Sequence, residues 1–203
     1  MDVDAVEIRV LGCLIEKQRT TPDQYPLSLN ALRLACNQKT NRDPIVEHDE
    51  RTIKAALERM STRGWTRFAS GASSRALKYR HLLDEALSLS GAELSLLAVL
   101  MLRGAQTLGE LKQRTERLHR FASLEEVAET IDGLGGRELV TRLERRPGQK
   151  EERYAQLLGG DAPDAASPVE HVAVDGVDRI AGIESRLERL ENAFEELSAR
   201  LDG

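Results

Sequence analysis

Aromatic residues are scarce in this chain, which has three Phe, three Tyr and one Trp among 203 residues. A hydrophobic core must therefore consist mainly of Leu, Ile, Val and Ala. Long hydrophobic runs are lacking too. The longest strongly apolar run, Leu96–Leu102, has seven residues, whereas a transmembrane helix needs about 20. The acidic segment Met1–Arg9 contains no apolar stretch, so we expect neither a secretory signal there nor a membrane protein.

Cysteine is also rare. The two cysteines, Cys13 and Cys36, are too few for a disulfide framework. Neither has a Cys or His neighbour at the spacing of a zinc-ligand pair, and we interpret both as small core side chains. These absences together favour a reduced, cytoplasmic protein.

The sequence shows no pattern typical of catalysis or cofactor binding. Its four histidines, His48, His81, His119 and His171, are widely separated. The glycine-rich stretch Gly133–Gly136 falls at the end of a predicted helix, whereas a phosphate-binding loop lies between a strand and a helix start. We therefore expect a non-enzymatic protein with no catalytic residue, no metal site and no cofactor.

The net formal charge is −5, but it is unevenly distributed. Residues 1–83 carry 14 Lys and Arg against 10 Asp and Glu, a net charge of +4. Residues 84–158 carry 11 against 13, a net charge of −2, and residues 159–203 carry 4 against 11, a net charge of −7. This asymmetry allows a nucleic-acid surface on the first part of the chain only.

The first part of the chain predicts three helices followed by two strands. The first helix is expected over Asp4–Lys17, and Ser28 and Asp49 are suited to cap the second and third. Alternation of apolar and polar residues then predicts strands at Trp65–Phe68 and Leu77–Leu83, with a small flexible loop between them. This order of elements is that of a winged helix.

The same order then repeats. Three capping boxes, each a Ser or Thr followed three residues later by Glu, predict three more helix starts: Ser90–Glu93, Thr107–Glu110 and Ser123–Glu126. Alternating segments follow at Leu139–Leu143 and Arg153–Leu158, and the closing strands of the two parts match at an offset of 75 residues. We predict an α+β chain, mainly helical with small β wings, that contains two tandem winged-helix domains.

The pattern divides the chain into four segments. The first winged-helix domain is expected at residues 1–84 and the second at residues 85–158. Residues 159–177 are rich in Gly, Ala, Asp and Pro and have no periodicity, which is typical of a flexible linker. A coiled-coil helix is expected at residues 178–203.

The predicted coiled coil carries a heptad repeat. Apolar residues recur at alternating spacings of three and four: Ile180, Ile183, Leu187, Leu190, Phe194, Leu197 and Leu201. In a parallel pair, Arg179 of one chain faces Glu184 of the other, and the next heptad repeats this pairing of opposite charges. The pattern favours a parallel homodimer, with packing of the helix on its own chain as the alternative. Three heptads alone are marginally stable, so the helix would reinforce another interface.

Three stretches together resemble the YceH-like family of bacterial proteins: Arg9–Lys17 (RVLGCLIEK), Thr21–Leu32 (TPDQYPLSLNAL) and Ala35–Pro44 (ACNQKTNRDP). The resemblance extends over residues 4–158. It implies a tandem winged-helix fold. It implies little chemistry, because that family is uncharacterised in function.

The first predicted unit could bind nucleic acid. In DNA-binding winged helices the third helix enters the major groove, and the loop between the strands contacts the backbone. With Ile53 and Leu57 facing the core, basic residues of the third helix and wing face outward. The candidate nucleic-acid contacts are Arg51, Arg59, Arg63, Arg67, Arg75 and Lys78. An ordinary solvated surface is the alternative interpretation.

The second predicted unit has a different third helix. Its outward face carries Glu125, Glu129 and Asp132. Carboxylates aimed at phosphates would repel them and lose hydration without gaining partners. We therefore expect that this helix does not read DNA and that the second unit faces a protein. Its basic wing leaves contact with the DNA backbone open: Arg142, Arg145, Arg146, Lys150 and Arg153.

A polar loop, residues 37–43, forms a third candidate site. Four of its residues could recognise a peptide or a nucleic acid: Asn37, Lys39, Asn41 and Arg42. The alternative is that the loop stabilises its own turns, with the Asn side chains bonded to the backbone and Arg42 paired with Asp43.

Two functions remain open from the sequence. The first is a dimeric winged-helix protein that binds double-stranded DNA through its first unit, as a regulator would. The second is a protein-interaction module on tandem winged helices, which binds an unidentified protein partner and no DNA. The outward face of the third helix favours DNA binding in the first unit, where it carries arginines, and a protein partner in the second unit, where it carries carboxylates.

Overall fold

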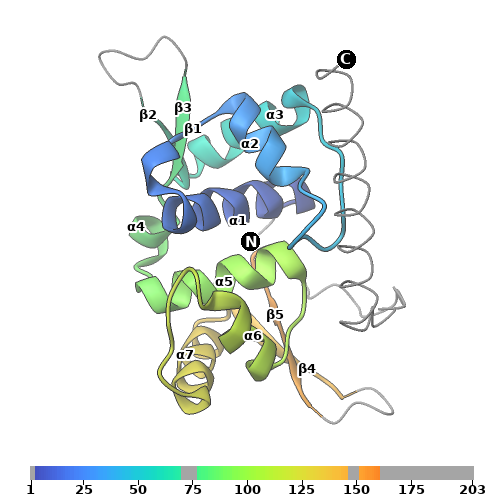
Figure 1. The fold of residues 1–203 in the computed structure, drawn as a ribbon, viewed down its shortest axis with the longest axis vertical. Helices are drawn as coiled ribbons and strands as arrows, with labels where there is room; N and C mark the ends of the chain where they lie inside the picture. The colour runs from blue at the N-terminus through green and yellow to red at the C-terminus, as the bar shows by residue number, and fades with distance from the viewer. Residues whose placement is uncertain (1–2, 70–76, 146–150, 161–203) are drawn as a thin grey trace, which may run out of the picture. The chain divides into compact units, whose positions relative to one another are not determined.

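The computed structural model describes residues 3–69, 77–145 and 151–160 (Figure 1). The described residues all belong to one compact unit. The predicted coiled coil and the predicted linker beyond Gly160 lie outside the described residues. The architecture combines helices with small antiparallel sheets, so the predicted α+β class is confirmed.

The first half of the compact unit contains helices and a three-stranded sheet. Its helices are α1 (Ala5–Thr20), α2 (Leu29–Cys36), α3 (Glu50–Thr62) and α4 (Leu83–Leu87), with a 3-10 helix at Pro22–Gln24. Its strands are β1 (Leu27–Ser28), β2 (Thr66–Ala69) and β3 (Lys78–His81). The strand order is β1-β3-β2, and both pairings are antiparallel.

The second half repeats much of this order. Its elements are α5 (Gly91–Arg103), α6 (Leu108–Thr115), α7 (Leu124–Gly136), β4 (Val140–Leu143) and β5 (Arg153–Gln156). The strands β4 and β5 pair antiparallel, and an isolated bridge joins Gln106 to Tyr154 on the other side of β5.

The helices begin at the predicted caps. Asp4 and Glu7 form a capping box at the start of α1, with N···O distances of 2.8 and 2.9 Å. The side chains of Ser28 and Asp49 cap α2 and α3, and the boxes that begin at Ser90 and Thr107 are also confirmed.

The third predicted capping box of the second half, Ser123–Glu126, differs from the prediction in one hydrogen bond. The Ser123 hydroxyl accepts the backbone N–H of Glu126, as predicted. The Glu126 carboxylate accepts instead from the backbone N–H of Ala122, at 2.7 Å. The helix therefore starts as predicted, and the Glu126 carboxylate satisfies the backbone N–H of the residue before the N-cap.

The predicted strand Leu77–Leu83 is too long. β3 ends at His81, and the chain enters the short helix α4 at Leu83. Alternation could not reveal this change, because Tyr79, His81 and Leu83 are all buried, first from a strand and then from a helix. Over so short a segment, a buried position at every second residue is consistent with one long strand and also with a short strand followed by a helix.

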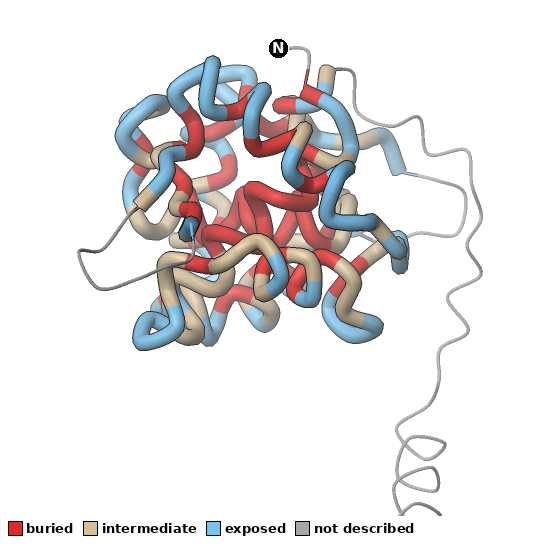
Figure 2. The backbone as a smooth tube through the Cα atoms, turned by 90° about the horizontal axis from the view of Figure 1, so that it is seen from above, coloured by how far each residue is buried: buried red, intermediate tan, exposed pale blue. Residues whose placement is uncertain are grey.

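The core is aliphatic, as the composition predicts, and it is shared by both halves. All residues of α1 from Glu7 to Ile15 are buried, and so are all residues of α5 from Leu94 to Leu102. Helices buried on every side lie at the centre of a fold, and these two pack against each other. Figure 2 shows the buried backbone gathered in the middle of the molecule, with exposed turns around it.

Gly12 lies where α1 and α5 approach each other most closely. A Cβ atom at this position would stand 2.9 Å from the Cγ and Cδ2 atoms of Leu102 and 3.1 Å from the Cβ of Met101. The absence of a side chain at Gly12 therefore permits the close helix contact that joins the two halves.

Candidate nucleic-acid interface

The outward face of α3 is exposed but largely neutralised. Arg59 bonds the carboxylate of Glu7 at 3.2 Å and also pairs with Asp4, so it bridges α3 to the start of α1. Lys54 lies 3.8 Å from Glu58 on the same helix. Arg51 is exposed and makes no ion pair with any residue that the structure describes. Of the two basic residues predicted on this helix, Arg51 is the one without an ion pair to a described residue, although the nearby Asp49 carboxylate partly offsets its charge.

The strands β2 and β3 gather positive charge on one face. In their antiparallel register Arg67 is opposite Arg80, and Ala69 is opposite Lys78. Because alternate residues of a strand share a face, these three basic residues lie on the same side of the sheet. We call Arg67, Lys78 and Arg80 the cationic hairpin face. The sequence names these residues as basic positions of the strands, and the register, which it does not reveal, sets Arg67 directly opposite Arg80.

The charge of this face is only partly balanced. Arg80 pairs with Glu85 at 3.2 Å, whereas Arg67 and Lys78 have no acidic partner within the described part of the chain. Like charges directly opposite each other destabilise a strand pair. Repulsion between Arg67 and Arg80 therefore lowers the stability of the strand pair, and a bound anion would offset this repulsion.

The other two predicted basic residues differ in their surroundings. Arg63 follows α3 and stands over the ring of Trp65, 6.0 Å from its centroid. Arg75 lies outside the described residues.

The opposite side of the same hairpin is apolar. Phe68 is the cross-strand partner of Tyr79, and their ring centroids are 5.1 Å apart. Tyr79 is 4% exposed, whereas Phe68 is 48% exposed and Leu77, just before β3, is 60% exposed. The sequence analysis did not single out these two exposed residues, because alternation alone predicts which residues share a face and not which face is covered.

The polar loop after α2 is held by contacts with other parts of the fold. Arg42 is buried, and its guanidinium donates to Glu16 at 3.1 and 2.6 Å and to the carbonyl of Ala35 at 3.1 Å. The Asn37 side chain bonds both the N–H and the carbonyl of His48, each at 2.9 Å. Of the four predicted recognition residues, Asn37, Arg42 and, through Arg103, Asn41 are therefore engaged within the fold.

The ionic partner of Arg42 differs from the prediction: it is Glu16 of α1, and the predicted pairing with Asp43 is not the contact observed. Burial acts to raise the pKa of Glu16, but the hydrogen bond and charge of Arg42 outweigh it and hold that pKa below its ordinary value.

The remaining residues of this loop are more exposed. Lys39 and Asn41 are exposed. Asn41 adopts a positive φ of 61°, and its side chain accepts a hydrogen bond from Arg103 at the end of α5. The loop therefore also connects the first half to the second.

Cys13 and Cys36 are both fully buried, which confirms their interpretation as core side chains. Among the described residues, no group of His, Cys, Asp and Glu is arranged to hold a metal ion. No described helix has the length and apolar character required to cross a bilayer.

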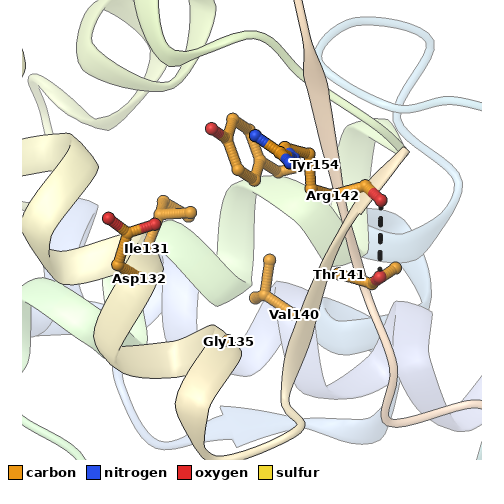
Figure 3. A pocket seen from close by; sticks show the side chains of 7 residues that line it. All are labelled: Ile131, Asp132, Gly135, Val140, Thr141, Arg142 and Tyr154. Atoms are coloured by element: carbon orange, nitrogen blue, oxygen red, sulfur yellow. Dashed lines mark hydrogen bonds between the residues drawn. The ribbon is translucent and has the colours of Figure 1, made fainter. Parts of the chain in front are cut away.

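The second half presents an acidic helix face beside a small hollow. Glu125, Glu129 and Asp132 are all exposed on α7, as predicted. At its C-terminal end, α7 and the two strands enclose a cavity of about 270 Å³, in which Asp132 lies on the helix side and Tyr154 on the strand side (Figure 3). The residues around it are Ile131, Asp132, Gly135, Val140, Thr141, Arg142 and Tyr154.

The hollow is small for a ligand site. Small-molecule sites usually measure about 300–1,000 Å³, so this cavity lies below their lower limit. Arg142 at its edge is paired with Glu152 at 3.1 Å, whereas Asp132 makes no ion pair with a described residue.

Fold and sequence together define a class of bacterial α+β proteins without an assigned activity. Residues 3–149 match the family described as "Protein of unknown function, DUF480", and the chain belongs to this family. The predicted resemblance to YceH-like proteins is confirmed. The chain is 43% identical to the UPF0502 protein YceH of Escherichia fergusonii over 99% of its own length and 95% of that protein.

Two further relatives also match over nearly the whole chain. A UPF0502 protein of Solibacter usitatus is 46% identical over 96% of this chain and 95% of that protein. A UPF0502 protein of Pelobacter propionicus is 48% identical over 94% of this chain and 90% of that protein.

Proposed function

We propose that this protein is a non-enzymatic DNA-binding protein whose two halves are tandem winged helices. The order of helices followed by a two-stranded hairpin, present in both halves, supports this fold assignment. The first half would contact DNA, and the heptad repeat beyond residue 177 would hold two chains together as a cytoplasmic homodimer. A dimer of this kind would suit a regulator that binds paired sites.

The cationic hairpin face carries the proposal. Arg67 and Lys78 project from adjacent strands, share one face with Arg80 and have no carboxylate partner among the described residues. Phosphates are the groups that neutralise such a face in DNA-binding proteins, and contacts with them position a protein on the duplex. Of the predicted α3 contacts, Arg51 remains available, whereas Arg59 is engaged by Asp4 and Glu7. The proposed interface is therefore centred on the hairpin, with α3 in a secondary role.

The test is the salt dependence of binding to a fluorescein-labelled DNA duplex of mixed sequence, measured by anisotropy. The logarithm of the affinity should fall with the logarithm of the salt concentration by about 0.9 for each phosphate neutralised. An Arg67→Ala/Lys78→Ala variant should bind more weakly and lower this slope by up to about 2.

The matched control is Arg117→Ala/Arg120→Ala, which removes the same charge from exposed positions in the second half. It should leave both affinity and slope within error of the wild type. If the wild-type protein does not bind the duplex even at low salt, where the electrostatic attraction is strongest, binding of double-stranded DNA is refuted.

A second function is favoured by α7. Its three exposed carboxylates and the hollow beside Asp132 suit a protein partner better than a phosphate backbone. Under this function the protein is an interaction module, and a partner recovered from lysate would remain bound after nuclease treatment. A Glu129→Lys/Asp132→Lys variant should lose that partner, whereas the hairpin variant should retain it.

A further inference from the structure

The β2–β3 hairpin has two chemically different faces, and the proposed phosphate contacts use only one of them. Arg67, Lys78 and Arg80 occupy the cationic face. Phe68 and Tyr79 occupy the other, and Leu77 falls on the same side as Tyr79 by the alternation of strand residues. The hairpin therefore presents charge on one side and exposed apolar side chains on the other.

The exposure of Phe68 is unusual in this chain. Only seven aromatic residues are present, and Trp65, Tyr79 and Phe121 are at most 6% exposed, whereas Phe68 is 48% exposed. Exposed aromatic rings next to basic side chains are typical of proteins that stack nucleobases. The ring of Phe68 leans on Tyr79 at a tilt of 48°, and this contact orients it on the sheet.

The position of β2 brings the cationic face and the exposed part of Phe68 within reach of one ligand, whereas Tyr79 on the same side as Phe68 is packed into the core. β2 is an edge strand of the sheet, because the strand order is β1-β3-β2. A nucleic-acid strand that runs along this edge can place phosphates on the cationic side and a base on the apolar side. Each nucleotide carries both groups, so a single strand matches the two-faced hairpin.

We infer that the β2–β3 hairpin binds single-stranded DNA, with phosphates against Arg67 and Lys78 and an unpaired base stacked on Phe68. This inference rests on the proposed DNA binding and specifies the form of DNA that this site prefers. In a duplex the bases are already stacked, and one of them is exposed only when a base step is opened. The free-energy cost of opening that step offsets the gain from stacking the base on an aromatic side chain, whereas in a single strand this cost does not arise.

The test compares labelled oligothymidylate with a duplex of equal length, titrated with the full chain at one salt concentration. Phe68→Ala should weaken oligothymidylate binding by about 10-fold, within the range of about 5- to 150-fold that loss of one stacked base implies. Its salt slope should stay unchanged, because no charge is removed. Duplex binding should change by less than about twofold, since no base is available there to stack.

Conservative variants separate stacking from packing. Phe68→Leu keeps an apolar contact with Tyr79 but has no ring, and it should bind oligothymidylate as weakly as Phe68→Ala. Phe68→Trp should restore wild-type affinity, and its fluorescence should be quenched when oligothymidylate is added. Leu34→Ala is the matched control, because Leu34 is 56% exposed on α2, and it should bind as the wild type does.

The outcomes distinguish this inference from the proposed function. If Phe68→Ala and Phe68→Leu bind oligothymidylate like the wild type while Arg67→Ala/Lys78→Ala does not, base stacking is refuted and phosphate binding stands. If neither oligothymidylate nor duplex binds at low salt, both are refuted. Binding to vesicles of anionic lipid that depends on Phe68, without binding to oligothymidylate, would overturn the inference in favour of a membrane surface.

Discussion

Arg42 shows how a residue that resembles a recognition contact can serve the fold. Its side chain is fully buried, and it forms an ion pair with Glu16, whose side chain is 14% exposed. Loss of one partner of a buried ion pair leaves the other without compensation, which costs about 3–5 kcal/mol.

We therefore expect Arg42→Met to lower the free energy of unfolding by about 3 kcal/mol, measured by urea denaturation. Lys39→Ala, an exposed change in the same loop, should stay within about 0.5 kcal/mol of the wild type. Under native conditions the Arg42→Met variant should bind DNA as the wild type does. A variant of normal stability with lost binding would instead identify a recognition residue.

His81 offers a test that depends on pH. Burial lowers its pKa to about 4, although the carboxylate of Asp84, 3.5 Å from Nδ1, acts in the opposite direction. Nearby Arg19 and Arg80 lower it further. In the unfolded chain the pKa is about 6.5, so the unfolded state takes up the proton first as the pH falls.

The stability that depends on neutral His81 is fully present above about pH 6.5 and is lost as the pH falls toward 4. Between pH 6.5 and 5 the carboxylates contribute least to the pH dependence of stability. In this range the free energy of unfolding should decrease by roughly 1–2 kcal/mol. His81→Gln should flatten this part of the profile, because it cannot take up a proton. Equal slopes for the two proteins would show that His81 does not control the change.

At the scale of single elements, the contact between α1 and α5 depends on Gly12. Alanine is a better helix former than glycine by about 1 kcal/mol. A Cβ at this position, however, would meet Leu102 at 2.9 Å, and overpacking of a core costs about 1–3 kcal/mol. We expect Gly12→Ala to lower the melting temperature in spite of its helix propensity.

Gly133 on α7 is the matched control, since a Cβ there meets nothing within 4 Å. Gly133→Ala should therefore raise the melting temperature, because it stabilises a helix by about 0.5–1 kcal/mol. If both substitutions changed stability in the same direction, the close packing at Gly12 would not control the helix contact.

The sequence predicted local features of these elements well. The caps at Asp4, Ser28 and Asp49 depend on side chains within three residues of their partners, so spacing alone reveals them. The pairing of Arg59 with Asp4 joins residues 55 positions apart, and no local pattern indicates it. For the same reason the sequence predicted Arg67 and Lys78 but not the register that places Arg80 beside them.

At the scale of the whole molecule, the predicted dimer depends on the heptad repeat. Leu187→Asp places a charge in the apolar seam, where it would be desolvated on pairing. The dissociation constant of the dimer should rise at least about tenfold, measured by sedimentation equilibrium of the chain of 22.6 kDa. Arg189→Asp, at a position outside the seam, should leave it nearly unchanged. A wild-type mass of one chain would refute the dimer.

The shared core also sets a limit on how the protein can be divided. Each of α1 and α5 packs on elements of its own half, α2 and α3 for α1 and α6 and α7 for α5, and each covers the side of the other that those elements leave open. A fragment that ends at residue 84 would leave the apolar side of α1 in water, and a fragment that begins there would do the same to α5. Despite their repeated order of elements, the two halves are not interchangeable modules: neither can be lost, duplicated or exchanged in evolution without a replacement for the surface that its partner supplies.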